Sequence, residues 1–599
     1  MKLKIYSCCF FLCCMFFSML GQESIIYSKV QQEKNKGKVF NSVKIFSSSK
    51  LNTDVLRSFK NKEEVYFFSY DNSILKTKKK TISIDIPMGS TKMSLELIEV
   101  DNSFYDYTIT TGSGKIISAN RSNKHYQGIV KGNPNSLAAV SFFKDDVMGI
   151  VSTEKGNFNI VKINDIGQYM IYNDLNLKER PEFECSAIDD KKFKGYDPNV
   201  LSRKGKTMKS ANTPCVDLYY ETKYDMFQNL GSITAVENYV CGLHNQVAVL
   251  YLNENIPTKI SEIRVWDISD PYTGTNPRDL LYEFRNSSYQ FSGDLGQLLT
   301  FDNIGGGIAF VNTLCNSIYN VSVSGSLSNT ITNIPNYSWN VYVVAHEFGH
   351  SFGSGHTHAC IWNGNNTPID GCGTVSGCVD PGIPSGGGTI MSYCHLQSGV
   401  GINFSLGFGL QPGNVMRNNV SNASCVNYCC PIDEIVTTDL SNSTDEVQAS
   451  QTITATNTVY FGGTAIYHAG QEVLLQDDFS ALSGATFRAY IEGCTDSFAS
   501  RSATDALTFS DEISKDETSE EIQQMYIAPN PNRGAFSVYF EEEESGILQI
   551  LDFKGELIQT LEFEKTTKLS VDIQQNLPGM YFVKVRTASK TFIEKVIKK

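Results

Sequence analysis

Four side chains between positions 346 and 356 have the types and the spacing of a catalytic metal site. The segment reads HEFGHSFGSGH and contains His346, Glu347, His350 and His356. His346 and His350 are four residues apart, so on a helix both imidazoles project from one face and can bind one metal ion. Glu347 lies beside them, where its carboxylate can hold and deprotonate a metal-bound water instead of acting as a ligand.

A glycine between the second and third histidines predicts how the third ligand reaches the metal. Only glycine adopts a left-handed backbone at little cost, so Gly353 is expected to end the helix and begin a turn. The turn would bring His356 back as the third ligand. Three neutral imidazoles with one open position form the usual catalytic zinc site, so we predict one Zn²⁺ ion. A Ca²⁺ site cannot be read from this sequence.

A core-packing role for these histidines is the simpler alternative, because an isolated H-E-x-x-H also occurs by chance in large proteins. The extended pattern adds Gly353 and His356 at fixed offsets, and four of the eight histidines lie between positions 346 and 358. The apolar run at 341–345 precedes the motif, as expected of a buried helix. These observations favour the metal site.

Length and charge limit what surrounds this site. A chain of 599 residues is expected to contain several domains. The net charge of −13 and the pI near 5.3 argue against nucleic acid and anionic membranes as partners. No stretch beyond the N-terminus has the length and apolarity of a membrane span, so we expect no transmembrane segment in the mature chain.

The N-terminal 21 residues have the pattern of a secretory signal peptide. Lys2 and Lys4 precede an apolar run at 5–20, and Gly21 offers a small residue for cleavage. Removal of this segment would take four of the sixteen cysteines with it. Export makes disulfides the expected state of the other twelve, although their pairing cannot be read from the sequence.

A second motif lies downstream at 388–393, where the sequence reads GTIMSY. Together with the extended histidine motif, it resembles the Met-turn of the metzincin metalloproteases. The resemblance implies an α/β, zincin-like catalytic domain at 212–430, with Met391 as a hydrophobic floor beneath the metal ligands. Tyr393 occupies the position at which some metzincins carry a tyrosine that approaches the metal. This auxiliary role is left open, because other metzincins lack the tyrosine.

Two further features resemble the reprolysin branch of the metzincins. The segment 306–310 (GGIAF), followed by Cys315, is similar to the reprolysin edge strand that pairs with the substrate backbone. A cysteine-rich loop after the site also fits: Cys360, Cys372, Cys378 and Cys394. Thr357 departs from the aspartate that reprolysins usually carry there, which leaves the exact subfamily open. His358 and His395 are expected near the site or at the surface, not as ligands.

Residues 22–205 are expected to form a β-rich propeptide domain. They contain alternating segments such as 81–86, and the stretch 126–150 resembles reprolysin propeptides, which implies a zymogen. Cys185 could place a thiolate on the open zinc position, although a cysteine that is paired elsewhere or simply buried remains the alternative. The basic run at 203–206 is a candidate processing point.

Three segments follow the catalytic domain. Residues 435–495 are expected to form a small β module of open role, with His468 at its surface, and residues 496–524 form an acidic linker. Residues 525–599 contain PNPNRGAF and GMYFVKV, and resemble the type IX secretion sorting domain of Bacteroidetes. An ordinary Ig-like β-sandwich is compatible with the same residues. The resemblance implies the type IX machinery as a partner and a secreted or surface-attached location.

The predicted fold is therefore multidomain, with a β-rich pro-domain, an α/β metzincin domain, a small β module and a C-terminal Ig-like β-sandwich. The predicted function is a secreted zinc metalloendopeptidase that acts on peptide bonds of extracellular proteins, with Glu347 as general base and acid. Two alternatives remain: an inactive metzincin-like domain used for adhesion, and an adhesin whose 452–494 module carries the function. Cleavage specificity and the natural substrate cannot be read from the sequence.

Overall fold

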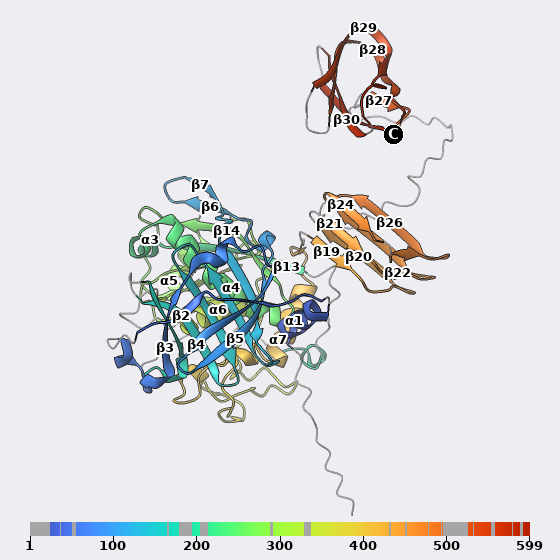
Figure 1. Cartoon of the computed structure of the whole chain (residues 1–599). Coiled ribbons are helices and arrows are strands. Elements are labelled where there is room, and N and C mark those ends of the chain that lie inside the picture. The colour runs from blue at the N-terminus through green and yellow to red at the C-terminus, as the bar shows by residue number, and fades with distance from the viewer. Residues whose placement is uncertain are drawn as a thin grey trace, which may run out of the picture. The chain divides into compact units, whose positions relative to one another are not determined.

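The computed structural model divides into two compact units, residues 1–499 and residues 500–599 (Figure 1). The described residues are 24–599 without 36, 51–54, 164–166, 179–194, 204–213, 288–290, 329–336, 430–432, 450–451, 477, 493, 495–524, 531, 553–556, 578 and 588–590. The predicted signal peptide, Cys185 and the acidic linker lie outside the described residues.

The N-terminal domain is built on a ten-stranded, mostly antiparallel sheet in the order β1-β4-β5-β8-β9-β10-β11-β12-β3-β2. Alternate residues of these strands point inward, as Ile82, Ile84 and Ile86 do in β4, and form a separate hydrophobic core. The strands are β1 Asn41–Val43, β2 Phe46–Ser48, β3 Val65–Tyr70, β4 Thr81–Met88, β5 Thr91–Glu99, β8 Lys124–Val130, β9 Leu137–Phe142, β10 Val147–Thr153, β11 Gly156–Ile163 and β12 Gln168–Asn173.

The catalytic region has a second, mostly parallel sheet in the order β16-β17-β15-β13-β14-β6-β7. Parallel strands are usually buried on both faces, and all five residues of β15 are buried, including the polar Gln297. Its own strands are β13 Pro214–Thr222, β14 Thr258–Val265, β15 Leu295–Leu299, β16 Gly307–Ala309 and β17 Val321–Ser324. The strand β16 is antiparallel to β17 and forms the edge of the sheet, at the place predicted for the edge strand.

Helices cover this sheet, and two of them form its core. The long helix α4 (Ile233–Asn253) begins at the Ser232 cap, whose side chain accepts a hydrogen bond from the Ala235 N–H, and it packs against α6 (Tyr337–Ser351). Residues 341–348 of α6 are fully or almost fully buried. The other helices are α1 Ile25–Asn35, α2 Pro198–Leu201, α3 Tyr224–Leu230, α5 Pro277–Arg285 and α7 Leu410–Ser421.

The N-terminal domain and the catalytic region are joined through the sheet itself. The hairpin β6 (Thr108–Thr111) and β7 (Ile116–Ser118) comes from the N-terminal domain, and β6 adds to β14 as a parallel neighbour. One hydrophobic core contains residues of both parts, including Ile109, Ile129 and Met148 from the first and Val240 and Phe348 from the second. The two parts therefore pack as one body.

The small β module is a stack of parallel strands. The β19-β21-β24 and β20-β23-β26 sheets are parallel, and strands neighbouring in a sheet lie about 20 residues apart in sequence, as in the coils of a solenoid. The strands are β19 Asp433–Val436, β20 Thr444–Ala449, β21 Thr452–Ala455, β22 Thr458–Val459, β23 Thr464–Ala469, β24 Glu472–Leu475, β25 Ser480–Ala481 and β26 Thr486–Ile491.

This stacking makes one expectation wrong. His468 is fully buried, because in-register pairing places it beside Tyr490 of the next coil, with the ring centroids 4.9 Å apart. The alternating pattern of β23 indicated a strand correctly. It could not show that a further coil covers the polar side of that strand.

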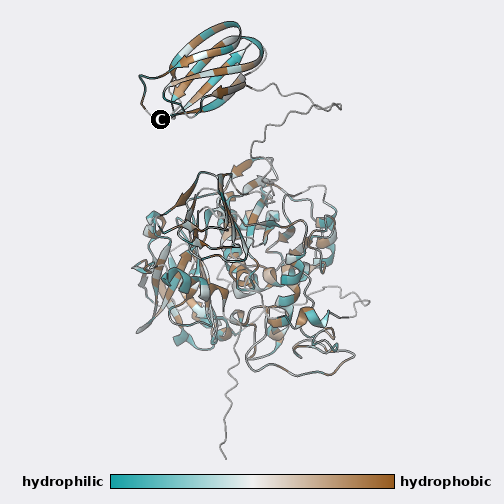
Figure 2. Cartoon of the chain, turned by 90° about the vertical axis from the view of Figure 1, so that its right-hand side faces the viewer, coloured by the Kyte–Doolittle hydropathy of each residue, from teal (hydrophilic) through white to brown (hydrophobic). Residues whose placement is uncertain are grey.

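The C-terminal unit is an antiparallel sheet in the order β27-β28-β30-β31, with β29 paired to β28. Apolar and polar side chains alternate along these strands, as Figure 2 shows, and the inward set forms a core around Val538, Ile550 and Val583. The long β28 pairs with three other strands. The strands are β27 Met525–Ala528, β28 Ala535–Asp552, β29 Leu557–Asp572, β30 Gly579–Thr587 and β31 Thr591–Lys598.

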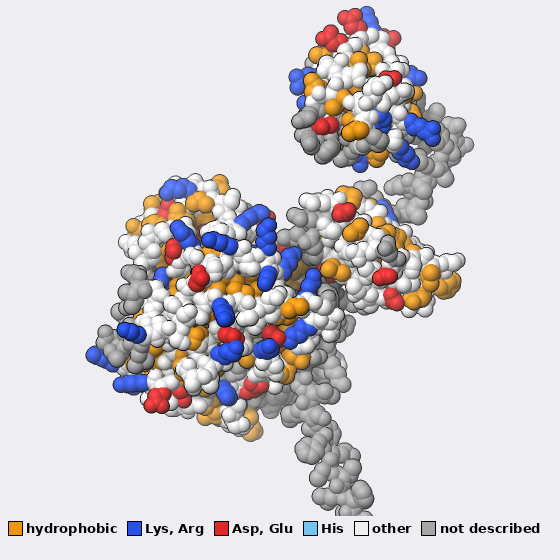
Figure 3. All heavy atoms as spheres, viewed as in Figure 1, with side chains coloured by type: hydrophobic (Ala, Val, Ile, Leu, Met, Phe, Trp, Pro, Cys, Tyr) orange, Lys and Arg blue, Asp and Glu red, His pale blue; other side chains and the backbone are white. Residues whose placement is uncertain are grey.

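The surface of the described part is that of a mixed-charge protein. Acidic and basic side chains are interspersed on the face seen in Figure 3. Among the described residues, no helix is both long enough and apolar enough to cross a membrane.

Candidate metal centre

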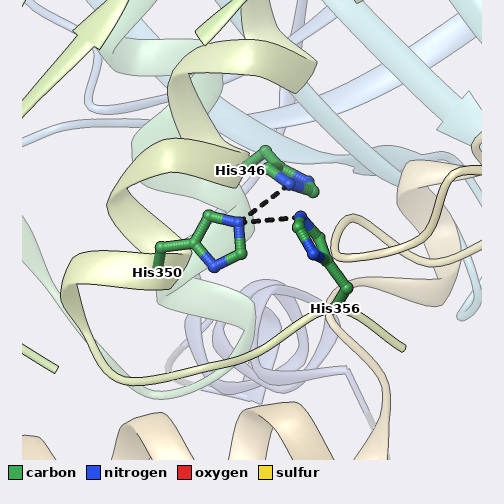
Figure 4. A group of neighbouring side chains, drawn as sticks. All are labelled: His346, His350 and His356. Carbon is green, nitrogen blue, oxygen red and sulfur yellow. Dashed lines mark hydrogen bonds between the residues drawn. The ribbon is translucent and has the colours of Figure 1, made fainter. Parts of the chain in front are cut away.

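The helix α6 presents two of the predicted ligands on one face. His346 and His350 are one turn apart, and their Nε2 atoms are 3.1 Å apart. His356 comes from the loop after the helix, and its Nε2 lies 3.0 Å from that of His350. Figure 4 shows the three rings pointing toward one another. The structure thus brings together the three histidines that the sequence predicted as ligands.

Backbone carbonyls fix the orientation of the two helical ligands. The Nδ1–H of His346 donates to the Ile390 carbonyl at 2.8 Å, and the Nδ1–H of His350 donates to the Ser354 carbonyl at 2.7 Å. A carbonyl can only accept, so each of these rings carries its proton on Nδ1. Each Nε2 therefore keeps its lone pair for a metal ion, as expected for ligating histidines.

The bend between the second and third ligands forms at Gly353, as the sequence predicted. The helix ends at Ser351, and Gly353 has a φ of +106°, which a residue with a Cβ rarely adopts. A Cβ at Gly353 would also lie 2.1 Å from Nδ2 of Asn419. The next residue after the third ligand, Thr357, donates from its N–H and its hydroxyl to the Met391 carbonyl. This residue ties the ligand loop to the Met-turn.

Met391 lies directly against the ligand helix. It is fully buried, and its Sδ is 2.5 Å from the position that a Cβ at Gly349 would occupy. Only a glycine at position 349 therefore lets the thioether approach the helix between its two histidines. The neighbouring Ile390 supplies the carbonyl that orients His346. The role of Met391 as the floor beneath the metal ligands stays a prediction.

Glu347 faces the edge strand β16. A Cβ at Gly307 would lie 2.6 Å from both Cγ and Oε1 of Glu347, so the carboxylate occupies the space beside this glycine. Glu347 is fully buried. The carboxylate thus lies between the ligand helix and the strand predicted to bind substrate backbone.

The donor set fits a zinc ion. Zinc–nitrogen bonds of about 2.0–2.1 Å in a tetrahedral site place ligand nitrogens about 3.3 Å apart, close to the two observed separations. Among the described residues, these three histidines form a cluster whose ligand atoms all lie within 4.8 Å of one another. A second such cluster, Asp370 with Cys372 and Cys394, is not a candidate, because its two cysteines form a disulfide.

Electrostatics keep the three ligand rings neutral. Burial lowers the pKa of His346 and of His356 well below the usual value, and lowers the pKa of His350 to about 4. The neighbouring imidazoles act in the same direction, because a second positive charge beside the first is unfavourable. Neutral imidazole is the form that binds a metal ion.

Aromatic and histidine side chains surround the third ligand. The half-buried Tyr393 lies with its ring 4.7 Å from that of His356, and His358 stacks on His356 at 5.1 Å. The ring centroid of His395 lies 5.8 Å from that of Tyr393 and 4.9 Å from that of Tyr342. His358 and His395 are near the site without belonging to the ligand cluster, as expected. The auxiliary role of Tyr393 stays a prediction.

Disulfides, whose pairing could not be read from the sequence, hold the loops around the site. Cys372–Cys394 closes the Met-turn loop, and Cys360–Cys378 closes the loop after the third ligand. Cys315–Cys425 and Cys215–Cys429 join the start, middle and end of the catalytic domain. Cys241 is buried and free, so the expectation of a disulfide is wrong for this residue, and Cys430 lies outside the described residues.

Sequence reasoning missed several residues that shape the site. Spacing alone cannot reveal the carbonyls of Ile390 and Ser354 that orient the ligands, or the absence of a side chain at Gly349 that leaves room for Met391. Tyr196 is a further example, since its hydroxyl hydrogen bonds at the bend before His356, from outside the predicted catalytic boundaries. The repeated glycines of HEFGHSFGSGH were the one visible signal of close packing.

Comparison with known families places two parts of the chain. Residues 212–400 match the family model described as metallo-peptidase family M12, and residues 526–599 match the secretion system C-terminal sorting domain. The resemblances to a reprolysin-type peptidase and to a secretion sorting domain are therefore confirmed, and with them the assignment of a metallopeptidase domain. The sorting domain implies export from the cell.

Two solved structures are similar to parts of this chain at low sequence identity. One is described as a chaperone–substrate complex, with 8% identity over 58% of this chain and a TM-score of 0.24. This chain spans 57% of that one. Another is archaemetzincin from Methanopyrus kandleri, with 15% identity, 35% of this chain and 96% of that chain covered, and a TM-score of 0.21.

Proposed function

Starting from a metallopeptidase domain with this histidine site, we propose that the protein is a secreted zinc endopeptidase made as a zymogen. The observation that carries the proposal is the convergence of three Nε2 atoms, with the Glu347 carboxylate beside them under the edge strand. When bound, zinc supplies Lewis acidity that polarises a carbonyl and acidifies water. Protein and peptide chains outside the cell are the proposed substrates.

The proposed chemistry of the protein side chains centres on one carboxylate. Glu347 accepts a proton from the attacking water at its carboxylate and later delivers that proton to the amine leaving group. His346, His350 and His356 hold the ion, and the carbonyl partners of Nδ1 in His346 and His350 keep the Nε2 lone pairs of these two rings directed inward. The strand β16 is at the sheet edge, so we propose that it aligns an extended peptide antiparallel to itself.

Zymogen formation is supported by the way the N-terminal domain holds the catalytic region. Asn157 donates to the Ile402 carbonyl and accepts from the Phe404 N–H, just beyond the Met-turn. Asn159 donates to Ser338 at the start of the ligand helix. Segments on both sides of the metal centre are therefore tied to this domain. We propose that its removal frees the site, and that Cys185 serves as the zinc-blocking thiol before removal.

The interface between the N-terminal domain and the catalytic region is partly apolar, because one hydrophobic core contains residues of both parts, and partly polar. The face of α4 that meets the N-terminal domain carries Glu237, Asn238 and Asn245, which hydrogen bond to Tyr107, Asn123 and Gln127. Polar groups of this kind can bond to water once the partner has gone, so their exposure costs little.

The test is the substitution Glu347→Gln, assayed on casein with protein purified after export. Removal of a general base typically costs about 10²–10⁴-fold in rate, while the histidines should still retain zinc. Glu472→Gln, an equal charge change at an exposed position of the solenoid, is the matched control. If Glu347→Gln cleaved casein as fast as the control, the assignment of the base would be wrong.

A further inference from the structure

The segment 195–203 lies against the metal centre although it precedes the domain that the family model matches. We call these residues the strap. The strap contains the short helix α2, which packs on α7. The Asn414 amide donates to the carbonyls of Leu201 and Arg203 at 2.9 and 2.7 Å. A small separate core joins Leu201 to Trp362 and Val415. The strap is thus a fitted part of the catalytic region.

One strap side chain reaches the bend that carries the third ligand. The hydroxyl of Tyr196 donates to the Gly353 carbonyl at 2.8 Å and accepts from the Gly355 N–H at 2.7 Å. These two bonds lie on either side of Ser354, whose carbonyl accepts the Nδ1–H of His350. The hydroxyl therefore fixes the peptide that orients the second ligand.

The same side chain supports the third ligand from the other direction. The ring of Tyr196 packs on that of Trp362, with centroids 4.5 Å apart. The indole N–H of Trp362 donates to the backbone carbonyl of His356 at 2.7 Å. Tyr196 thus contacts the backbone before His356 and the side chain that holds the backbone of His356 itself.

We propose that Tyr196 is a positioning residue of the metal centre, and that the strap stays with the catalytic domain in the mature protein. Its hydroxyl and ring hold His350 and His356 through the bend that joins them. Partners that orient ligands in this way typically contribute about 10–100-fold to metal affinity. This proposal rests on the proposed zinc site, but not on peptidase activity. Cleavage at the basic run 203–206 would cut the strap from the chain that follows it. The proposal therefore expects either no cleavage there or a cleaved strap that stays bound.

The first test measures zinc retention by the full chain against a competing chelator. Tyr196→Phe keeps the packing on Trp362 and removes both hydrogen bonds, so its zinc dissociation constant should rise about 10–100-fold. Tyr196→Ala should weaken binding further. Tyr70→Phe is the matched control, because it also loses a hydroxyl bond to a carbonyl, that of Phe143, in the N-terminal domain. Its zinc affinity should equal that of the parent.

The zinc-free proteins distinguish positioning from general stability. Tyr196→Phe and Tyr70→Phe should unfold at similar urea concentrations without zinc, while only the first shows weakened zinc binding. Equal zinc affinity of Tyr196→Phe and the parent would overturn the positioning role. Zinc binding does not require catalysis, so loss of the proposed function in a casein assay would leave this result unaffected.

The second test identifies the N-terminus of the exported, active protein by mass spectrometry. The proposal expects a mature chain that begins before residue 195, or a strap peptide that remains bound through native gel filtration. A fully active form that begins after Arg203 and carries no strap peptide would overturn it.

Discussion

The contact between Gly307 of the edge strand and Glu347 of the ligand helix yields a sharp prediction for Gly307→Ala. The added methyl would lie 2.6 Å from Cγ and Oε1 of Glu347 and 2.8 Å from its Cδ. Ordinary contacts between such atoms need about 3.5–4.0 Å, so the carboxylate has to retreat by about 1 Å. A displacement of about 1 Å in a catalytic group costs about 100-fold in rate, or about 2.7 kcal/mol in the activation barrier.

The same substitution should leave the fold and the metal ligands in place. Gly307 is not among the positive-φ residues, so an alanine there adds no backbone strain. The atoms that the methyl meets belong to a flexible side chain, which can move without the helix. We therefore expect zinc content close to that of the parent, a loss of stability no larger than the about 1–3 kcal/mol typical of overpacking, and kcat/KM on casein reduced about 100-fold.

The matched control is Gly386→Ala, in a loop where a Cβ would meet open space and the φ is also ordinary. Three measurements decide the outcome: zinc per chain, the melting temperature and kcat/KM for both variants. If Gly307→Ala retained parental kcat/KM, the carboxylate would not need its observed position. Loss of zinc from the variant would also contradict the reasoning, because it would show that the ligands had moved.

Two further predictions concern packing and pH. Gly349→Ala puts a Cβ 2.5 Å from the Met391 sulfur, and overpacking of about 1–3 kcal/mol should outweigh a helix-propensity gain of about 1 kcal/mol. A melting temperature above that of the parent would contradict this. Burial lowers the pKa of His125 to about 3. Below pH 6.5 the unfolded chain therefore binds more protons than the folded chain, and the free energy of unfolding decreases as the pH decreases, by about 2 kcal/mol at pH 5. In urea unfolding, the free energy of unfolding of His125→Gln should decrease less between pH 7 and pH 5 than that of the parent. An equal decrease in both proteins would show that His125 does not cause this pH dependence.

The ligand set could be predicted from the sequence because its geometry is local. His346 and His350 are fixed by the helical repeat, and Gly353 fixes the bend that returns His356, so a segment of eleven residues determines the site. The sorting domain was readable for a similar reason, since its motifs are short and contiguous.

Other properties could not be read because they depend on residues far apart in the chain. The disulfide pairs join positions as distant as Cys215 and Cys429, and any pairing of twelve cysteines was compatible with the sequence. His468 was expected at the surface, because nothing in one coil shows that the next coil covers it.

The sequence by itself determined which atoms can bind the metal, and the tertiary structure decided how those atoms are held. The Ile390 carbonyl orients His346 from 44 residues away, and Tyr196 reaches the bend from 157 residues before Gly353. Gly307 leaves room for Glu347 only because β16 packs against α6. Local spacing follows from backbone geometry alone, whereas these contacts exist only after the chain has packed its strands, helices and loops together.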